Sequence, residues 1–295
     1  MILAEKEMCE HRAIAQLFTS QAISKIAEGN LTLIHKILEE NLRPQSFPLK
    51  VENVFELALK TLLKNYKNEY IFKNTIINKI LCKKNKKSST TILSEFRVGD
   101  NKADLVIVNG HSVCYEIKTR YDSLKRLPDQ LSSYTKIFDK VYVVCDEYFK
   151  DEILNIIPSN VGVFEFTHRG ALREIKKAKV NIQPISYETM IDSLRMEEYK
   201  FIAECLTTRK VESRNIHIFN DCLEIFKESD PEKLRKYFRE SLKKFRGLDI
   251  DYISSVPNSL VNSAISYRMP KTKRNSLLEI LKLDIYKENI CTSRS

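Results

Sequence analysis

Residues 90–119 constrain the fold of this chain more strongly than any other segment. Apolar and polar residues alternate there with a period of two, which is typical of half-buried β-strands. The alternation occurs in three stretches, at 90–98, 102–108 and 112–119. Asn109 and Gly110 lie between the second and third stretches and form one of the strongest short signals for a hairpin turn. The sequence therefore predicts a three-stranded antiparallel meander.

Helical patterns precede this meander. Apolar residues recur at three-to-four spacing through residues 1–42, and amphipathic helices are expected from Val51 to about Leu63 and from about Glu69 to Leu81. The segment 43–48 contains two prolines and is typical of a linker. The polar basic run at 83–89 indicates an exposed loop, with a phosphate contact as the alternative.

Further elements follow the meander. We expect a helix over roughly 123–138 with Pro128 near its start, a strand at 140–145, a short helix near 148–156 and a strand at 161–167. After Gly170 the pattern is almost wholly helical, and Asp230 followed by Pro231 marks a clear helix start.

These patterns predict an α/β protein with three consecutive regions. They are an N-terminal helical region at 1–45, a core at 46–170 and a mainly helical C-terminal region at 171–295. The core would run helix, three-stranded antiparallel meander, helix, strand.

The net charge points to a polyanionic partner. Lys and Arg total 49 and Asp and Glu total 39, which gives +10, so nucleic acid or an anionic membrane surface is the first partner to consider. By region the charge is +6 over 1–90, −2 over 91–170 and +6 over 171–295. The flanking regions would therefore bind a phosphate backbone, while the acidic middle segment suits a metal site.

The remaining composition indicates a cytoplasmic protein. The seven cysteines are scattered and include no C-x-x-C pair, which fits a reducing compartment. Glu5, Glu7 and Glu10 lie where a signal peptide would need positive charge. No window of about 18 apolar residues exists, so we expect no membrane span. The five histidines lie far apart and are expected to be ordinary surface or core residues.

The register of the hairpin at Asn109 decides which side chains face one another. A two-residue turn would place Asp104 opposite Tyr115, whereas a three-residue turn over 109–111 would place Asp104 opposite Glu116. The second register also pairs Leu105 with Tyr115, and Ile107 with Val113, which keeps one continuous apolar set on one face. We therefore expect the second register.

This register predicts a metal site on the other face of the hairpin. Asp104 and Glu116 would face each other, and Lys118 would project from the same face. Two carboxylates this close repel each other unless a cation lies between them. Mg²⁺ or Mn²⁺ is the expected cation, with the Ile117 carbonyl as a third ligand. Such a metal activates water for attack on a phosphodiester, and Lys118 would orient that water.

Asp104 followed by Glu116, Ile117 and Lys118 resembles the PD-(D/E)xK nuclease superfamily. Ala103 stands in place of the usual proline. In the next helix Gln130 and Tyr134 match the Q-x-x-x-Y pattern of its RecB-like branch, and the wider stretch from Val51 to Asp146 is similar to an uncharacterised bacterial branch. The resemblance implies that Asp104, Glu116 and Lys118 form the catalytic site, and that Gln130 and Tyr134 support either this site or the DNA.

The resemblance also implies a further carboxylate ligand from the first helix or strand. Glu56, Glu69 and Glu95 compete for this position, and we favour Glu69 and Glu95. Lys125 and Arg126 could reach phosphates of the nucleic acid. The basic stretch at 268–274 is explained equally well as a solvated helix start.

The chain contains a second Glu-x-Lys, at Glu174 and Lys176, which serves as an internal control. The pattern around it is helical and lacks an upstream hairpin aspartate, so we expect a solvated helix face there.

The leading hypothesis is a Mg²⁺- or Mn²⁺-dependent nuclease that hydrolyses DNA, with phage defence or DNA repair as its setting. The alternative is a catalytically inactive module on the same fold that binds nucleic acid or a protein partner. A helical DNA-binding regulator built on 215–282 would need a helix-turn-helix that the sequence does not clearly show. A homodimer or an operon-encoded partner would fit either of the first two hypotheses.

Overall fold

The chain folds into two compact units, each assembled from segments far apart in the sequence. The structure is a computed structural model that describes residues 2–81, 90–181, 184–212 and 216–288. Unit 1 comprises 1–82, 168–170 and 249–295, and unit 2 comprises 83–167 and 171–248. The predicted C-terminal region at 171–295 thus contributes to both units. The predicted basic loop at 83–89 lies outside the described residues.

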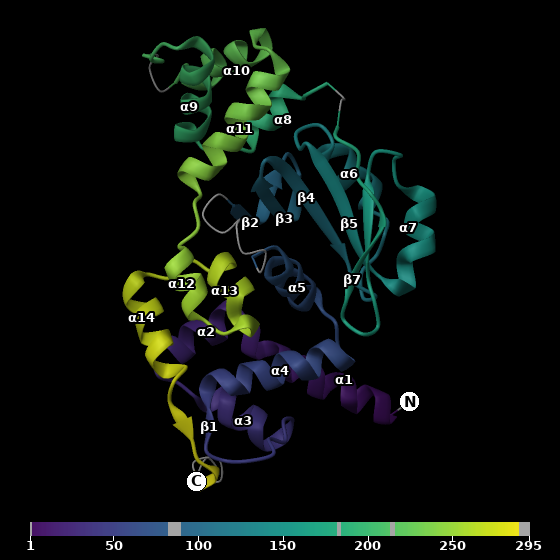
Figure 1. Cartoon of the computed structure of the whole chain (residues 1–295), viewed down its shortest axis with the longest axis vertical. Helices are drawn as coiled ribbons and strands as arrows, with labels where there is room; N and C mark the ends of the chain where they lie inside the picture. Colours follow the sequence, from purple (N-terminus) through teal and green to yellow (C-terminus); the bar gives the residue numbers. More distant parts are fainter. Residues whose placement is uncertain (1, 82–89, 182–183, 213–215, 289–295) are drawn as a thin grey trace. The chain divides into compact units, whose positions relative to one another are not determined.

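Unit 1 is almost entirely helical (Figure 1). Its helices are α1 (Ile2–Ala15), η1 (Gln16–Phe18), α2 (Ser20–Ala27), α3 (Thr32–Glu40), α4 (Val51–Asn65), α5 (Glu69–Leu81), α12 (Ile250–Ser255), η3 (Asn258–Leu260), α13 (Val261–Ser266) and α14 (Lys271–Ile280). The predicted helices over 1–42, 51–63 and 69–81 are confirmed. Strands β1 (Leu49–Lys50) and β8 (Asp284–Ile285) pair antiparallel and join an early and a late segment of the unit.

Buried polar contacts join the early and late parts of unit 1. Asn74, which is only 1% exposed, donates from Nδ2 to the Asn258 carbonyl at 3.0 Å and accepts at Oδ1 from the Asn262 amide at 3.0 Å. Glu56 accepts from the Ser259 amide at 2.9 Å. Because a buried polar group is costly without a partner, these pairings fix the late helices on the early ones. Glu56, one of the three competing carboxylates, is therefore part of this structural network.

Unit 2 is a mixed α/β arrangement around a six-stranded sheet in the order β2-β3-β4-β5-β6-β7. The strands are β2 (Thr91–Val98), β3 (Asn101–Asn109), β4 (His111–Lys118), β5 (Lys140–Asp146), β6 (Gly162–Phe166) and β7 (Leu172–Lys176). The first three form an antiparallel meander, β5 is parallel to both β4 and β6, and β7 is antiparallel to β6.

The helices of unit 2 are α6 (Leu127–Tyr134), η2 (Glu147–Phe149), α7 (Lys150–Ile156), α8 (Tyr187–Asp192), α9 (Met196–Thr207), α10 (Ile218–Glu228) and α11 (Pro231–Phe245). Pro128 lies in the first turn of α6, which explains why the helix begins later than expected. The helix start at Asp230 is confirmed, because its side chain accepts from the Glu232 amide at the beginning of α11.

The hairpin between β3 and β4 has the register that the apolar pattern favours. Leu105 pairs with Tyr115, and Ile107 with Val113. Gly110 forms the tip with φ 76°, a left-handed conformation that glycine adopts without strain. The register is therefore confirmed.

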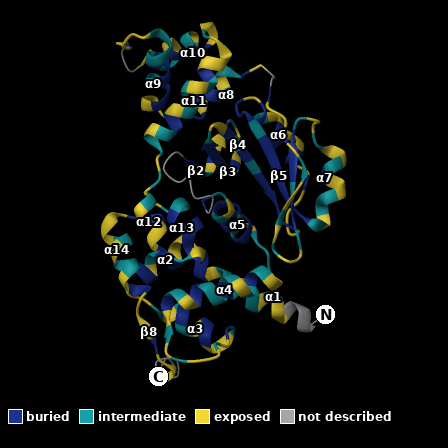
Figure 2. Cartoon of the chain, viewed as in Figure 1, coloured by how far each residue is buried: buried dark blue, intermediate teal, exposed yellow. Residues whose placement is uncertain are grey.

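The opposite face of the meander is also buried, which the alternating pattern alone did not indicate. Val106, Val108 and Cys114 project there into an apolar cluster that includes Leu127 and Leu131 of α6. Figure 2 shows the central strands mostly dark blue. The face that carries Asp104 is thus covered by α6 rather than left open to solvent.

The helix expected around Glu174 is wrong, because residues 172–176 form strand β7. Gly170 has φ 79°, and the Thr167 amide donates to the Ala171 carbonyl, so β6 and β7 are joined by a tight hairpin. Tyr142 donates from its hydroxyl to Glu174 at 2.8 Å. A five-residue strand is too short for its periodicity to be separated from that of a helix.

None of the helices formed by the described residues has both the length and the apolar character needed to cross a membrane.

The packing of β6 on β5 gives a stability prediction. A Cβ at Gly162 would lie 2.4 Å from the Tyr142 ring and 2.6 Å from the Ala178 backbone nitrogen, so Gly162→Ala should lower the free energy of unfolding by about 1–3 kcal/mol. Gly247→Ala is the control, because its Cβ would meet only the Lys243 carbonyl, at 3.4 Å. Urea denaturation measures both, and equal stability of the two variants would contradict this packing.

Candidate active site

Five of the predicted site residues lie together in unit 2. Asp104 comes from β3, Glu116 and Lys118 from β4, and Gln130 and Tyr134 from α6. The three strand residues share one face because side chains alternate along a strand. The two helix residues are one turn apart and face this side of the sheet. The arrangement follows directly from the hairpin register and from the packing of α6.

Lys118 lies at the centre of this cluster. Its Nζ donates to Glu116 Oε1 at 2.8 Å and to Gln130 Oε1 at 2.9 Å. The Tyr134 hydroxyl lies 3.1 Å from Glu116 Oε2 and 2.9 Å from the Lys102 carbonyl. Glu116 is 2% exposed and Lys118 is 5% exposed. Both oxygens of Glu116 therefore have partners, as a buried carboxylate requires.

Asp104 lies at the edge of the cluster and is half-buried. Its Oδ2 accepts from the Ile117 amide at 2.7 Å. The N–H and C=O of a strand residue point toward the same neighbouring strand, so the Ile117 carbonyl is also directed to the side of Asp104.

Glu95 lies on β2 in the register position opposite Asp104, between the pairs of Ser94 with Leu105 and Phe96 with Ala103. Its φ is 56°, which is unusual for a non-glycine residue inside a strand. Its exposed carboxylate pairs with Lys102 at 3.5 Å and offers an oxygen within 4.8 Å of one from Asp104. The unusual backbone conformation coincides with the convergence of two carboxylates.

Burial raises the pKa of Glu116 above its ordinary value of 4.5, and the charge of Lys118 with the hydrogen bonds from Lys118, Tyr134 and Gln130 offsets only part of this effect. Burial, followed by the charge of Glu116, also raises the pKa of Tyr134 and of Cys114. Both groups are therefore neutral at physiological pH and cannot serve as bases.

The donor set suits a hard divalent cation. Asp104 and Glu95 present carboxylate oxygens, which Mg²⁺ and Mn²⁺ prefer. Each carboxylate oxygen can accept more than one contact, so Glu116 could join them beside its present partners, Lys118 and Tyr134. The cluster thus has two carboxylates at its edge, Asp104 and Glu95, and a buried ion pair between Glu116 and Lys118 in its interior.

Three further residues of the predicted site come from other segments of the chain. Glu69 belongs to unit 1, where it begins α5 and forms an ion pair with Lys73 at 2.5 Å. Lys125 and Arg126 are exposed in the loop between β4 and α6.

The sequence analysis missed the residues that shape the loop after Lys118. Asp122 Oδ2 accepts from the Thr119 amide at 2.8 Å and from its hydroxyl at 2.7 Å. Arg120 pairs with the buried Asp146 at the end of β5, at 3.2 Å. The Thr-x-x-Asp spacing is a turn signal that could have indicated the first contact.

Taken together, fold and site define a mixed α/β protein with a carboxylate–lysine cluster at the carboxyl end of β4. The family model described as Bacteriophage P4 protein cII matches residues 63–287, which is more than half of the chain. The chain belongs to this family.

Two individual proteins show the extent of similarity. Protein cII of Enterobacteria phage P4 is 29% identical over 209 residues, which cover 68% of this chain and 77% of that protein. A solved structure, the SPO1766 protein of unknown function from Silicibacter pomeroyi, is 16% identical with a TM-score of 0.26. The latter match covers 33% of this chain and 64% of that chain, which is less than two thirds of its length, and a TM-score this low supports no conclusion about the fold.

The raised pKa of Glu116 predicts a pH-dependent stability. The folded state binds the Glu116 proton more tightly than the unfolded state, so this contribution is fully present below about pH 4.5 and is lost as pH rises through the folded pKa. Glu116→Gln mimics the protonated form at every pH. The free energy of unfolding of the variant, relative to that of the unsubstituted protein, should therefore increase from pH 4 to pH 8 in chelator-treated samples.

The Tyr134 hydroxyl can keep the Lys102 carbonyl as its partner in this variant. Glu174→Gln on β7 is the control, since Glu174 is exposed. A stability difference for Glu116→Gln that is flat or falls with pH would contradict the electrostatic account.

Proposed function

We propose that this protein is a divalent-metal-dependent nuclease that hydrolyses the phosphodiester bonds of DNA on a core of the PD-(D/E)xK type. The observation that carries the proposal is the convergence of Asp104, Glu116 and Lys118 on one face of β3 and β4. The two residues of the Q-x-x-x-Y pattern, Gln130 and Tyr134, contact this set directly. A random surface Glu-x-Lys would not be expected to have both.

The order of elements in unit 2 also supports this core. An antiparallel meander, β2 to β4, is followed by α6 and then by β5, which returns parallel to β4. The candidate site lies at the carboxyl end of β4, where parallel strands in α/β proteins generally place their functional groups.

The side chains have distinct roles in this proposal. Asp104, Glu95 and the Ile117 carbonyl would hold Mg²⁺ or Mn²⁺, with Glu116 as a further ligand. The bound metal would lower the pKa of a water molecule and neutralise charge on the phosphate. Lys118 would release Glu116, orient the attacking water and stabilise charge on the phosphate, while Gln130 would keep its ammonium in place.

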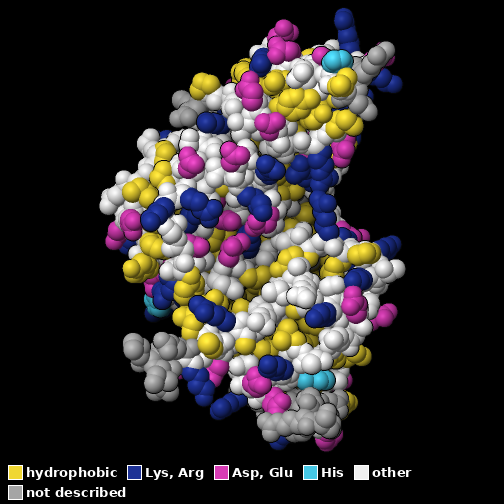
Figure 3. All heavy atoms as spheres, turned by 180° about the vertical axis from the view of Figure 1, so that it is seen from behind, with side chains coloured by type: hydrophobic (Ala, Val, Ile, Leu, Met, Phe, Trp, Pro, Cys, Tyr) yellow, Lys and Arg dark blue, Asp and Glu magenta, His cyan; other side chains and the backbone are white. Residues whose placement is uncertain are grey.

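The charge distribution supports a nucleic-acid substrate. Basic residues exceed acidic ones over 1–90 and 171–295, whereas the segment with the site is acidic. Figure 3 shows Lys and Arg side chains in several separate groups, with Asp and Glu among them. Lys125 and Arg126 are exposed in the loop that follows β4 and would contact phosphates of the nucleic acid in this proposal.

One observation favours the alternative of a catalytically inactive binding module. Both oxygens of Glu116 already have partners, and Glu116 and Lys118 are almost fully buried. In a binding module this pair would serve only to stabilise the packing of α6 on the sheet. The two experiments below separate the hypotheses.

Nuclease activity is the direct test. Purified protein incubated with supercoiled, linear and single-stranded DNA and with Mg²⁺ or Mn²⁺ should cleave at least one substrate, and Asp104→Asn and Lys118→Gln should each reduce the rate about 100-fold or more. Lys176→Gln, in the second Glu-x-Lys on β7, should leave the rate within twofold.

Asp104 is half-buried, so Asp104→Asn should fold even if Lys118→Gln, which leaves a buried Glu116 without its cation, does not. Cleavage that survives both substitutions would rule out this mechanism.

Metal binding is tested separately from catalysis. Mn²⁺ should raise the Tm of the unsubstituted protein, because a ligand that binds only the folded state stabilises it. Asp104→Asn should abolish the shift and Glu95→Gln should reduce it, whereas Glu174→Gln should not alter it. A Tm that does not respond to Mn²⁺ would favour the binding module.

A further inference from the structure

A second polar site lies at the opposite end of β4 and β5 from the candidate active site. His111 is the first residue of β4, and Asp139 directly precedes β5. They line a pocket of about 940 Å³ that lies wholly within unit 2. This volume is in the range of pockets that bind small molecules.

A buried carboxylate forms the base of the pocket. Asp139 is 3% exposed, and its Oδ2 accepts from the Ser112 amide at 2.7 Å and from the Ser112 hydroxyl at 2.9 Å. Arg239 Nη1 donates to the same oxygen at 3.0 Å. Three donors on one oxygen hold Asp139 firmly at the start of β5.

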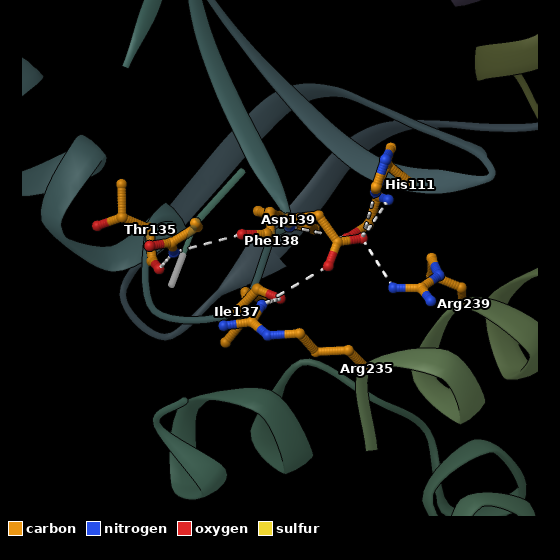
Figure 4. A network of polar contacts seen from close by, with 9 residues as sticks. His111, Thr135, Ile137, Phe138, Asp139, Arg235 and Arg239 are labelled. Carbon is orange, nitrogen blue, oxygen red and sulfur yellow. Dashed lines mark hydrogen bonds and ion pairs between the residues drawn. The ribbon is translucent and has the colours of Figure 1, made fainter. Parts of the chain in front are cut away.

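Two arginines of α11 converge on this single carboxylate. Arg235 and Arg239 are four residues apart and therefore lie on one face of the helix. Arg235 Nη1 is 3.8 Å from Asp139 Oδ1 and 3.4 Å from the Ile137 carbonyl. Figure 4 shows both guanidinium groups directed at Asp139, with His111 on the far side of the carboxylate. One negative charge thus faces two guanidinium charges.

The electrostatics of the pocket favour an additional anion. Burial lowers the pKa of Arg235, and the charge of Arg239 acts in the same direction, although Asp139 opposes both. Exposed Lys233 and Lys236 add positive charge to the lining. Asp230 and Glu232, which are also exposed on the lining at the start of α11, offset these two lysine charges, and water screens all four groups. The positive excess is therefore concentrated on the two partly buried arginines.

We propose that this pocket binds a phosphate group, with Arg235 and Arg239 as its principal donors. The planar guanidinium matches the spacing of phosphate oxygens, and a partly buried arginine pair binds phosphate more strongly than exposed lysines do. Tyr187, Pro184 and Ile185 give the pocket an apolar wall that can contact the remainder of a phosphorylated small ligand. The proposal is independent of nuclease activity at Asp104.

Calorimetric titration of the full chain with sodium phosphate, at constant ionic strength, tests this site. The unsubstituted protein should bind phosphate saturably, and Arg235→Gln should weaken binding about tenfold, as expected for the loss of a charge-assisted hydrogen bond. Lys236→Gln should weaken it less. Lys243→Gln, the same change on the same helix but outside the pocket, should have no effect.

Lys236 is exposed, so the Lys236→Gln variant is expected to fold. It serves as the test variant if Arg235→Gln fails to fold. The proposal would be overturned if phosphate did not bind saturably, or if Lys243→Gln weakened binding as much as the pocket variants do. It would also be overturned if a folded Arg235→Gln variant bound phosphate with unchanged affinity. If Arg235→Gln does not fold, the same conclusion would follow from an unchanged affinity of Lys236→Gln.

Two ligands distinguish the sources of the phosphate. Tighter binding of a nucleoside monophosphate than of inorganic phosphate would identify a small phosphorylated ligand. A phosphate group of a nucleic acid predicts two other results. Inorganic phosphate should displace labelled single-stranded DNA, and Lys236→Gln or Arg235→Gln should lower the salt dependence of DNA binding by about one phosphate contact.

Discussion

The hydrogen bonds from the Lys118 ammonium to Glu116 and Gln130 join the sheet of unit 2 to the helix that covers it. Both faces of the meander are buried. The Glu116 carboxylate and the Lys118 ammonium, on the face that α6 covers, must therefore pair with each other, because an unpaired buried charge would raise the free energy of the folded state. Gln130 and Tyr134 supply the remaining hydrogen bonds from α6, so the position of this helix and the geometry of the polar cluster depend on each other. Any change that exposes the cluster to a ligand must therefore also alter the packing of α6.

β4 and β5 connect two polar centres of opposite character. At the start of these parallel strands Asp139 is surrounded by cationic groups, and at the carboxyl end Asp104 and Glu95 form an acidic edge. In both centres a charged side chain is fixed by contacts from the backbone or a neighbouring strand: Asp139 by Ser112, and Asp104 by the Ile117 amide. The two strands thus run from the proposed phosphate site at one end to the proposed metal site at the other.

Much of unit 2 could be predicted from the sequence, because its signals are local. Asn109 and Gly110 predicted the hairpin turn. The apolar alternation predicted the register of β3, which carries Asp104, against β4, which carries Glu116. Glu95 was predicted as a ligand, but its positive φ has no sequence signal. Asp139 was missed because its arginine partners lie about a hundred residues away. Strand β7 was predicted as a helix because five residues carry too little periodicity, and only its tight turn at Gly170 indicated otherwise.

Unit 1 is assembled from segments far apart in the sequence, and this affects the order in which the two units can fold during synthesis. Its first 82 residues need the segment after Asp249 to satisfy Asn74 and to pair β1 with β8. Most of the residues of unit 2 emerge from the ribosome between these two parts. Unit 2 can therefore reach its native structure while the early helices of unit 1 still expose apolar surface, which makes the nascent chain dependent on rapid completion or on chaperones at that stage.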